Sequence, residues 1–271
     1  MADKTPPPHD RGPVLWDPAT GPTRMLISSI DRWTSSLLAD DGIDMPFMGN
    51  NDSVTAKIIA RSDGILAGCA AVDHMLQIWA GNLQISWSHG EGRSITSGDE
   101  IAVLNGDKEA VLLMERTILN LLGQLSGIAT ESKKWASKAP GQIACTRKTI
   151  WGLLDKWAVH LGGGLTHRLN KFDAKMIKEN DLAVMYPDID GNGARISRFL
   201  SEVKVEECGA FLEVEVREEK EAIMAAFSWS ERRMVDGCDR LVIMLDNFGP
   251  ERCKSCILYT SDAADDSLRV D

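Results

Sequence analysis

The chain has 271 residues, of which 44% are hydrophobic, and a formal net charge of −10 at neutral pH. This apolar content suffices for a sizeable core, and the length predicts two domains. The chain contains no run of 18 apolar residues, so we expect no membrane span and neither a membrane nor a nucleic acid as a partner. Its six cysteines are scattered, which favours free thiols in a reducing cytoplasm over a disulfide framework.

Prolines are frequent in the first 24 residues, which lack the apolar core of a signal peptide. We therefore interpret residues 1–24 as a disordered leader and expect a cytoplasmic protein. A small α+β domain is predicted over residues 25–114. It begins with a helix at 25–39, because apolar residues recur there at helical spacing. Turn signals containing glycine then separate three short predicted strands, at 55–60, 83–87 and 100–104.

The pattern changes near residue 109. Leucines three or four residues apart predict a long helix over 109–130, in which Arg116 and Asn120 share a face. Beyond it, strands are predicted at 142–146, 174–178, 211–216 and 241–245, and helices at 152–161, 196–206 and 220–227. This alternation is typical of right-handed βαβ units on a parallel sheet, so we predict an α/β barrel over residues 115–256.

The segment from Arg147 to Lys178 is basic although the chain is acidic, because it holds seven Lys or Arg residues against two Asp. It also contains Gly162-Gly163-Gly164, and exposed backbone N–H groups bind anions. Cations beside such a segment favour a small polyanionic ligand. Charge alone leaves a solvated basic face as an equal alternative.

Polar residues stand where four of the predicted strands end. They are Arg147-Lys148, Lys178, Glu215 and Asp246. In an α/β barrel the carboxyl ends of the strands meet at one mouth, where ligands bind. The sequence therefore predicts that these side chains converge on one site.

Several separately placed motifs support this site. They are Glu115-Arg116-Thr117, Cys145-Thr146-Arg147-Lys148-Thr149, Gly162-Gly163-Gly164, His167-Arg168, Ile177-Lys178-Glu179-Asn180, Glu213-Val214-Glu215-Val216 and Leu245-Asp246-Asn247-Phe248. In this order they resemble the quinolinate phosphoribosyltransferases, also called carboxylating nicotinate-nucleotide pyrophosphorylases. A series of motifs in register is far more specific than any single short pattern.

The resemblance implies an enzyme of NAD biosynthesis that converts quinolinate and phosphoribosyl pyrophosphate to nicotinate mononucleotide, pyrophosphate and CO2. Under it, the quinolinate carboxylates are bound by Arg147, Arg168 and Lys178, with His167 as a hydrogen-bond donor, and Thr146 is a further substrate-binding residue. The resemblance further implies that Arg116 reaches the substrate of a neighbouring subunit in a homodimer or hexamer.

The same resemblance gives three residues catalytic roles. Lys148 is expected to face the phosphoribosyl group. Glu215 and Asp246 are expected to coordinate Mg²⁺ and pyrophosphate, directly or through water, and to stabilise the positive charge that develops on ribose C1.

Two of the sequence's departures from the family bear directly on the site and on the fold. Asp181 stands where the family usually has histidine after Lys178-Glu179-Asn180. Residues 257–271 no longer follow the family, so we expect a truncated chain and an incomplete barrel. Two alternatives stay open: a related transferase that acts on another aromatic acid, such as nicotinate, without decarboxylation, and an inactive fragment that retains only binding or oligomerisation.

Overall fold

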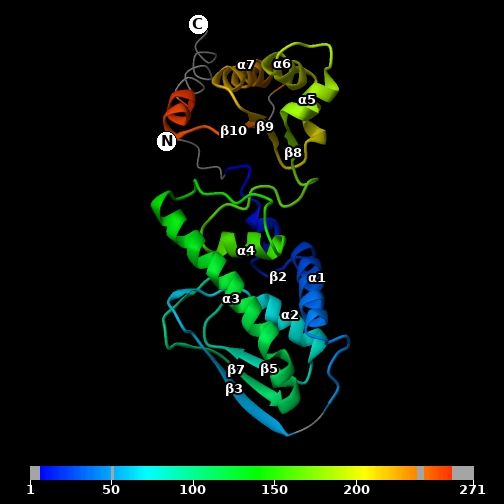
Figure 1. Ribbon diagram of the computed structural model, residues 1–271, viewed down its shortest axis with the longest axis vertical. Helices are drawn as coiled ribbons and strands as arrows, with labels where there is room; N and C mark the ends of the chain where they lie inside the picture. The colour runs from blue at the N-terminus through cyan, green and yellow to red at the C-terminus, as the bar shows by residue number, and fades with distance from the viewer. Residues whose placement is uncertain (1–6, 50–51, 237–240, 258–271) are drawn as a thin grey trace. The chain divides into compact units, whose positions relative to one another are not determined.

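The computed structural model describes residues 7–49, 52–236 and 241–257 (Figure 1). The chain forms two compact units, one of residues 9–169 and one of residues 1–8 with 170–271. The first unit combines an antiparallel sheet with helices, and the second is α/β with a parallel sheet. The predicted class, an N-terminal α+β part followed by an α/β part, is confirmed. The expected tail at 257–271 lies outside the described residues except for Ile257.

The first unit is built on a three-stranded antiparallel sheet in the order β3-β7-β5. The strands are β3 (Ser53–Ile59), β7 (Glu100–Asp107) and β5 (Gln84–Trp87), and a small pair, β4 (Gly64–Ile65) with β6 (Ser94–Ile95), lies apart from them. The helices are α1 (Arg24–Asp40), α2 (Cys69–Trp79), α3 (Lys108–Lys138) and α4 (Leu153–Leu161). In this unit α1, the three main strands, α3 and α4 lie close to where the sequence predicts them.

Helix α2 was not predicted, because its start carries no ordinary capping residue. Gly68 precedes it with a φ of 103°, and the carboxylate of Glu91, distant in sequence, accepts the backbone N–H groups of Gly68 (2.9 Å) and Ala70 (3.2 Å). The cap is thus supplied by tertiary structure, which local sequence patterns do not reveal.

Helix α3 is longer than predicted and belongs to the core of the first unit. Asp107 caps it by accepting the N–H groups of Glu109 (2.8 Å) and Ala110 (3.1 Å). Its buried face continues through Ala129 and Ala136 to the last turn. The compact units therefore divide after Leu169, not at the boundary between residues 114 and 115 that the sequence suggested.

Much of the segment interpreted as a disordered leader is ordered. Residues Gly12–Val14 form a 3₁₀ turn, and strand β1 (Trp16–Asp17) pairs with β2 (Gly21–Pro22). Leu15 is completely buried, and the ring of Trp16 stacks on Trp157 with centroids 5.0 Å apart. The prediction was wrong for residues 7–24 because it weighed the prolines above these two apolar side chains.

The second unit contains three parallel strands in the order β10-β9-β8, among the residues that the structure describes. They are β8 (Lys175–Ile177), β9 (Leu212–Val216) and β10 (Leu241–Leu245). The helices are α5 (Glu179–Met185), α6 (Asn192–Glu202) and α7 (Glu219–Asp236), and residues Val205–Glu207 form a 3₁₀ turn. Helices α6 and α7 lie side by side, and α7 packs on β9 and β10 (Figure 1). Closure into a barrel stays a prediction.

The strand predicted at 142–146 is reduced to an isolated bridge. Ala144 pairs with Leu165, through hydrogen bonds from Leu165 N–H to Ile143 O (2.7 Å) and from Cys145 N–H to Leu165 O (3.0 Å). The alternation of this stretch leaves Gln142, Ala144 and Thr146 exposed, so it resembles a strand in sequence, but among the described residues it pairs only at this bridge and does not join the sheet of its unit.

Candidate functional site

The second unit gathers three predicted site residues at one edge of its sheet. Lys178 follows β8, Glu215 is the last residue but one of β9, and Asp246 follows β10. Because Ile177 is in register with Val214, Lys178 lies level with Glu215, and the pairing of Leu245 with Val216 places Asp246 just beyond the end of β9. Lys178, Glu215 and Asp246 therefore share the carboxyl edge, as expected for a parallel sheet.

An ion pair joins two of these residues. The ammonium of Lys178 donates to Oε2 of Glu215, whose side chain is 6% exposed, whereas that of Lys178 is 47% exposed. All five residues of β9 are buried, which includes Glu213 two positions before Glu215. A buried carboxylate needs a cationic or hydrogen-bonding partner, and here the partner remains accessible from solvent.

Asp246 is oriented by groups that the sequence analysis did not select. Its Oδ2 accepts a hydrogen bond from Nδ2 of Asn247 (3.0 Å) and lies 3.6 Å from Nε of Arg217. Arg217 also donates through Nη1 to Oε2 of Glu179 at 2.6 Å. Arg217 directly follows β9, so its place at a strand end was the signal that would have identified it.

Asp181 has a local structural role. Its Oδ2 accepts the backbone N–H of Lys178 at 3.0 Å and so caps the first turn of α5. An acidic residue is favourable there because the N-terminus of a helix carries a partial positive charge. The carboxylate that replaces the family histidine is thus engaged with the backbone beside Lys178.

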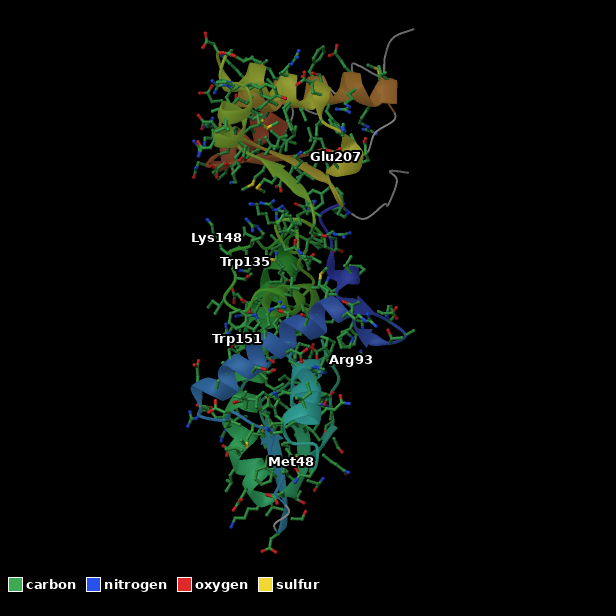
Figure 2. The ribbon with its side chains drawn as sticks, turned by 90° about the vertical axis from the view of Figure 1, so that its right-hand side faces the viewer. Met48, Arg93, Trp135, Lys148, Trp151 and Glu207 are labelled. Carbon is green, nitrogen blue, oxygen red and sulfur yellow. The ribbon has the colours of Figure 1, made fainter. Side chains whose placement is uncertain are left out.

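The first unit carries the other predicted residues on two chain segments. Thr146, Arg147 and Lys148 are exposed on the loop between α3 and α4, and Figure 2 shows Lys148 at the periphery of this unit. The backbone N–H of Lys148 donates to Oγ1 of Thr146 at 3.1 Å. Asp155 fixes the end of this loop, because its Oδ2 accepts the N–H groups of Ile150 (2.7 Å) and Trp151 (3.0 Å).

Thr166, His167 and Arg168 form a turn in which Thr166 and Arg168 are buried and His167 is half-buried. Thr166 is completely buried and Arg168 is 7% exposed. His167 has a φ of 52°, in the left-handed region that a non-glycine residue occupies at an energetic cost. Such a conformation persists only where surrounding contacts fix it.

Lys156 joins this turn to the preceding loop. It is 1% exposed, and its Nζ donates to the carbonyl oxygens of Thr166 (2.7 Å) and Thr146 (3.1 Å). Its distance to Sγ of Cys145 is 3.5 Å. Burial raises the pKa of that thiol, although Lys156 acts in the opposite direction. From the sequence, Lys156 was counted only as one of the seven cations of the basic segment.

Gly162-Gly163-Gly164 does not present free N–H groups, contrary to the interpretation from sequence. The three amides donate to Ala158 O (3.1 Å), His160 O (2.9 Å) and Val159 O (3.0 Å). A Cβ at position 162 would lie 2.3 Å from the carbonyl oxygen of Ala129, and Gly163 has a φ of 87°. These glycines allow α3 and α4 to pack closely.

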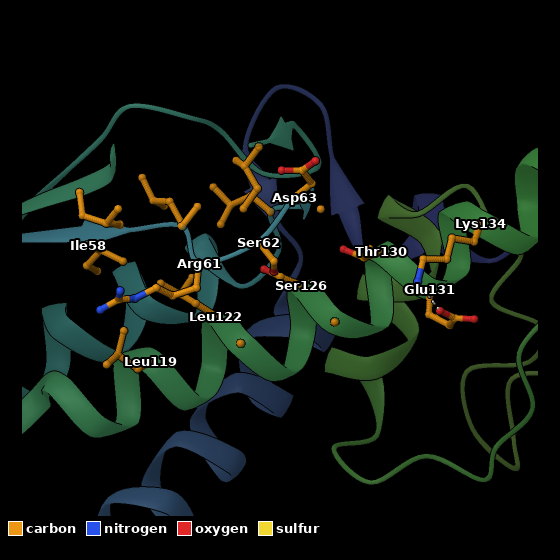
Figure 3. Close-up of a pocket in the computed structure, with 18 residues that line it drawn as sticks. Ile58, Arg61, Ser62, Asp63, Leu119, Leu122, Ser126, Thr130, Glu131 and Lys134 are labelled. Atoms are coloured by element: carbon orange, nitrogen blue, oxygen red, sulfur yellow. Dashed lines mark hydrogen bonds and ion pairs between the residues drawn. The ribbon is translucent and has the colours of Figure 1, made fainter. Parts of the chain in front are cut away.

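Arg116 lies on the exposed side of α3, and its side chain makes no hydrogen bond or ion pair with any residue that the structure describes. The side chains of Leu112, Leu113 and Leu119 are exposed on the same helix. Nearby, a cavity of about 580 Å³ lies between α3 and the segment from Ile58 to Gly64, and Figure 3 shows Leu119, Leu122 and Ser126 along its helical wall. Exposed leucines beside an open cavity are typical of a surface that another molecule covers.

Within residues 7–49, 52–236 and 241–257 there is no group of three His, Cys, Asp or Glu side chains placed to hold a metal ion. Over the same residues, none of the helices is long and apolar enough to cross a membrane.

Comparisons with known proteins relate both halves of the chain to one family. Residues 34–126 match the family description "Quinolinate phosphoribosyl transferase, N-terminal domain", and residues 128–270 match "Quinolinate phosphoribosyl transferase, C-terminal domain". A probable carboxylating nicotinate-nucleotide pyrophosphorylase of Methanothermobacter thermautotrophicus is 33% identical over 211 residues, which cover 75% of this chain and 69% of the relative. A chloroplastic carboxylating nicotinate-nucleotide pyrophosphorylase of Arabidopsis thaliana is 34% identical over 200 residues, which cover 72% of this chain and 56% of the relative.

Solved structures agree with these relationships. The nicotinate-nucleotide pyrophosphorylase of Francisella tularensis superposes with a TM-score of 0.67 at 28% identity, covering 87% of this chain and 80% of that one. Family matches in both halves, relatives above 30% identity and a shared fold lead to one conclusion. The chain belongs to the quinolinate phosphoribosyl transferase family.

Proposed function

We propose that this protein transfers the phosphoribosyl group of phosphoribosyl pyrophosphate to quinolinate and releases pyrophosphate and CO2, so that nicotinate mononucleotide is formed. The observation that carries the proposal is the edge formed by Lys178, Glu215 and Asp246, where an ammonium paired with one carboxylate, and a second carboxylate, lie at the ends of three parallel strands. The cation suits a dicarboxylate substrate, and the carboxylates suit the metal ion that accompanies phosphoribosyl pyrophosphate.

Quinolinate carries two adjacent carboxylates, which require several cations or donors. We assign their binding to Arg147 and Arg168 through guanidinium hydrogen bonds, and to Lys178 through its ammonium. Thr146 contributes a hydrogen bond from the loop that carries Arg147, and His167 contributes one from the turn that carries Arg168. When quinolinate engages Lys178, Glu215 loses its intramolecular cation and becomes available for the phosphoribosyl substrate.

In the transfer step, the lone pair of the pyridine nitrogen forms a bond to ribose C1 while the bond from C1 to pyrophosphate breaks. Glu215 and Asp246 stabilise the positive charge on the ribose, and Lys148 faces the phosphoribosyl group. The ring nitrogen is then cationic and accepts the electron pair released when the neighbouring carboxylate leaves as CO2. A proton replaces the carboxylate on the ring carbon, and the protein's part in this last step is orientation.

The carboxylates fit Mg²⁺ as the metal of this reaction. Mg²⁺ prefers oxygen ligands and commonly takes one or two protein carboxylates together with substrate phosphates. Glu215 and Asp246 supply such a pair, and the described residues form no larger cage that would hold the ion alone. Bound with pyrophosphate, Mg²⁺ would neutralise negative charge on the leaving group.

Two further parts of the proposal concern the partner and the compartment. We assign Arg116 to the substrate site of a second copy of this chain, because its side chain is exposed and stands among exposed leucines of α3.

We assign the protein to a reducing compartment such as the cytoplasm. Its described cysteines are free thiols, namely Cys69, Cys145, Cys208, Cys253 and Cys256.

Equilibrium binding of quinolinate tests the assignment of the cations. Arg147→Ala should weaken the affinity by about 1.5–3 kcal/mol, the scale of a charge-assisted hydrogen bond, and should reduce the preference for quinolinate over nicotinate. Arg93→Ala is the matched control, since Arg93 is also an exposed arginine in a loop (Figure 2). Equal quinolinate affinity in the parent and Arg147→Ala, measured by titration calorimetry, would contradict the proposal.

A further inference from the structure

The segment from His9 to Trp16, here called the N-terminal strap, packs against α4. Leu15 is fully buried, Trp16 stacks on Trp157 at 5.0 Å, and Trp157 stacks in turn on His160 at 5.4 Å. The carboxylate of Asp10 lies 3.6 Å from Nδ1 of His160. Aromatic stacking and apolar burial therefore fix one end of the strap to the helix.

The strap approaches α4 so closely that one position excludes a side chain. A Cβ at Gly12 would lie 2.1 Å from Nδ1 of His160, well inside van der Waals contact. Glycine is thus required at position 12 for the strap to lie where it does.

The other end of the strap contacts the turn that carries two proposed quinolinate-binding residues. The backbone N–H of Arg11 donates to Oγ1 of Thr166 at 2.7 Å, and the ring of His9 meets that of His167 edge-on at 6.4 Å. Thr166 is completely buried, so this hydrogen bond is protected from solvent.

Thr166 is consequently held from two directions, since its hydroxyl accepts from the strap and its carbonyl accepts from Lys156 at 2.7 Å. The next residue is His167, whose φ of 52° requires such external support. We propose that the N-terminal strap is a positioning element that sets the affinity for quinolinate by holding the turn of Thr166, His167 and Arg168. The inference rests on the proposed function, and the strap precedes residue 34, where the family match begins.

Two substitutions at position 166 test the contact without removing the strap. Thr166→Val keeps the shape but removes the acceptor for the Arg11 N–H, whereas Thr166→Ser keeps the acceptor. We expect Thr166→Val to weaken quinolinate binding about three- to tenfold, the effect of losing one ordinary hydrogen bond, and Thr166→Ser to remain within about twofold of the parent. The KM for phosphoribosyl pyrophosphate should stay within about twofold in both, because the turn is assigned to quinolinate.

A second pair of variants displaces the strap itself. Gly12→Ala introduces the clash with His160, and Gly90→Ala is its control, because a Cβ at Gly90 meets no atom within 4 Å. Hydrogen exchange of the peptide containing residues 164–169 should accelerate in Gly12→Ala and stay unchanged in Gly90→Ala. Quinolinate affinity should fall only in Gly12→Ala.

The outcomes distinguish a failure of the strap proposal from a failure of the proposed function. If the parent binds quinolinate but Thr166→Val and Gly12→Ala bind it equally well, the strap has only a structural role and the inference is overturned. The inference is also overturned if, in these variants, the affinities for quinolinate and for phosphoribosyl pyrophosphate fall together and follow the loss of melting temperature. If the parent binds no quinolinate, the proposed function fails and the inference fails with it.

Discussion

Lys156→Met is the substitution that perturbs the first unit most specifically. The methionine side chain has nearly the same length but no donor, so the carbonyl oxygens of Thr166 and Thr146 lose the ammonium that lies 2.7 Å and 3.1 Å from them. The loop that carries Arg147 and the turn that carries Arg168 would then lose their shared side-chain anchor and be joined mainly by the bridge between Ala144 and Leu165.

The expected cost follows from the environment of the two acceptors. The contact with Thr166 is buried, and the donor that stays there is the weak thiol of Cys145 at 3.3 Å, so the carbonyl bears most of the penalty of an unsatisfied polar group, about 1–3 kcal/mol. The contact with Thr146 is only partly buried, and water can replace the ammonium there, so its loss adds about 0.5–1 kcal/mol. Relief from burying the charge offsets part of this sum. We expect a net loss of about 1.5–3 kcal/mol in the free energy of unfolding.

Urea denaturation at neutral pH measures this loss, and calorimetric titration with quinolinate measures its effect on binding. Lys133→Met is the matched control, because Lys133 is an exposed lysine on α3. Lys156→Met should lower stability and quinolinate affinity together, whereas Lys133→Met should change neither by more than about 0.5 kcal/mol. Stability of Lys156→Met equal to that of the parent would show that the buried ammonium is not the anchor we describe.

Three other perturbations have defined outcomes. Lys178→Met should cost about 1–3 kcal/mol by leaving Glu215 buried without its cation, and adding Glu215→Gln should recover part of that loss; a double-mutant cycle in denaturant with no coupling would refute the pairing. Burial raises the pKa of Glu91 above 4.5, so the stabilisation that this group contributes is complete at low pH and is lost as the pH rises through its folded pKa. Melting temperatures of Glu91→Gln should therefore improve relative to the parent as the pH rises above the ordinary pKa of a glutamate, and a difference that does not vary with pH would contradict this sign. Arg116→Ala and Lys178→Ala should each be inactive but regain activity when mixed, if Arg116 serves a second subunit; no recovery after verified subunit exchange would exclude that role.

The sequence was informative where local pattern and final structure coincide. Strand β10 was predicted to the residue, because a short apolar run there stands between turn signals, and Lys178, Glu215 and Asp246 were placed at strand ends by the βα alternation alone. Helix α2 escaped prediction because its N-terminal cap is Glu91, which lies beyond the end of the helix in sequence.

The sequence was misinterpreted where one residue type is common both at binding surfaces and in the packed interior. Lys156 counts toward the charge of a basic segment, yet its ammonium is buried on carbonyl oxygens, and burial depends on tertiary contacts. Gly162 was interpreted as part of an anion-binding loop, but a close approach to Ala129 explains it. Residues 1–24 looked like a leader because their six prolines outnumber Leu15 and Trp16, the two apolar residues that anchor the N-terminal strap.

The central claim is decarboxylating transfer to quinolinate, and the stoichiometry of one reaction tests it. Purified protein would be incubated with phosphoribosyl pyrophosphate, Mg²⁺ and quinolinate labelled in the carboxylate next to the ring nitrogen, and the labelled CO2 and nicotinate mononucleotide would be counted. We predict equal amounts of the two products and no nucleotide when nicotinate replaces quinolinate. Nucleotide formed from nicotinate without CO2, or quinolinate bound without any product, would contradict the account.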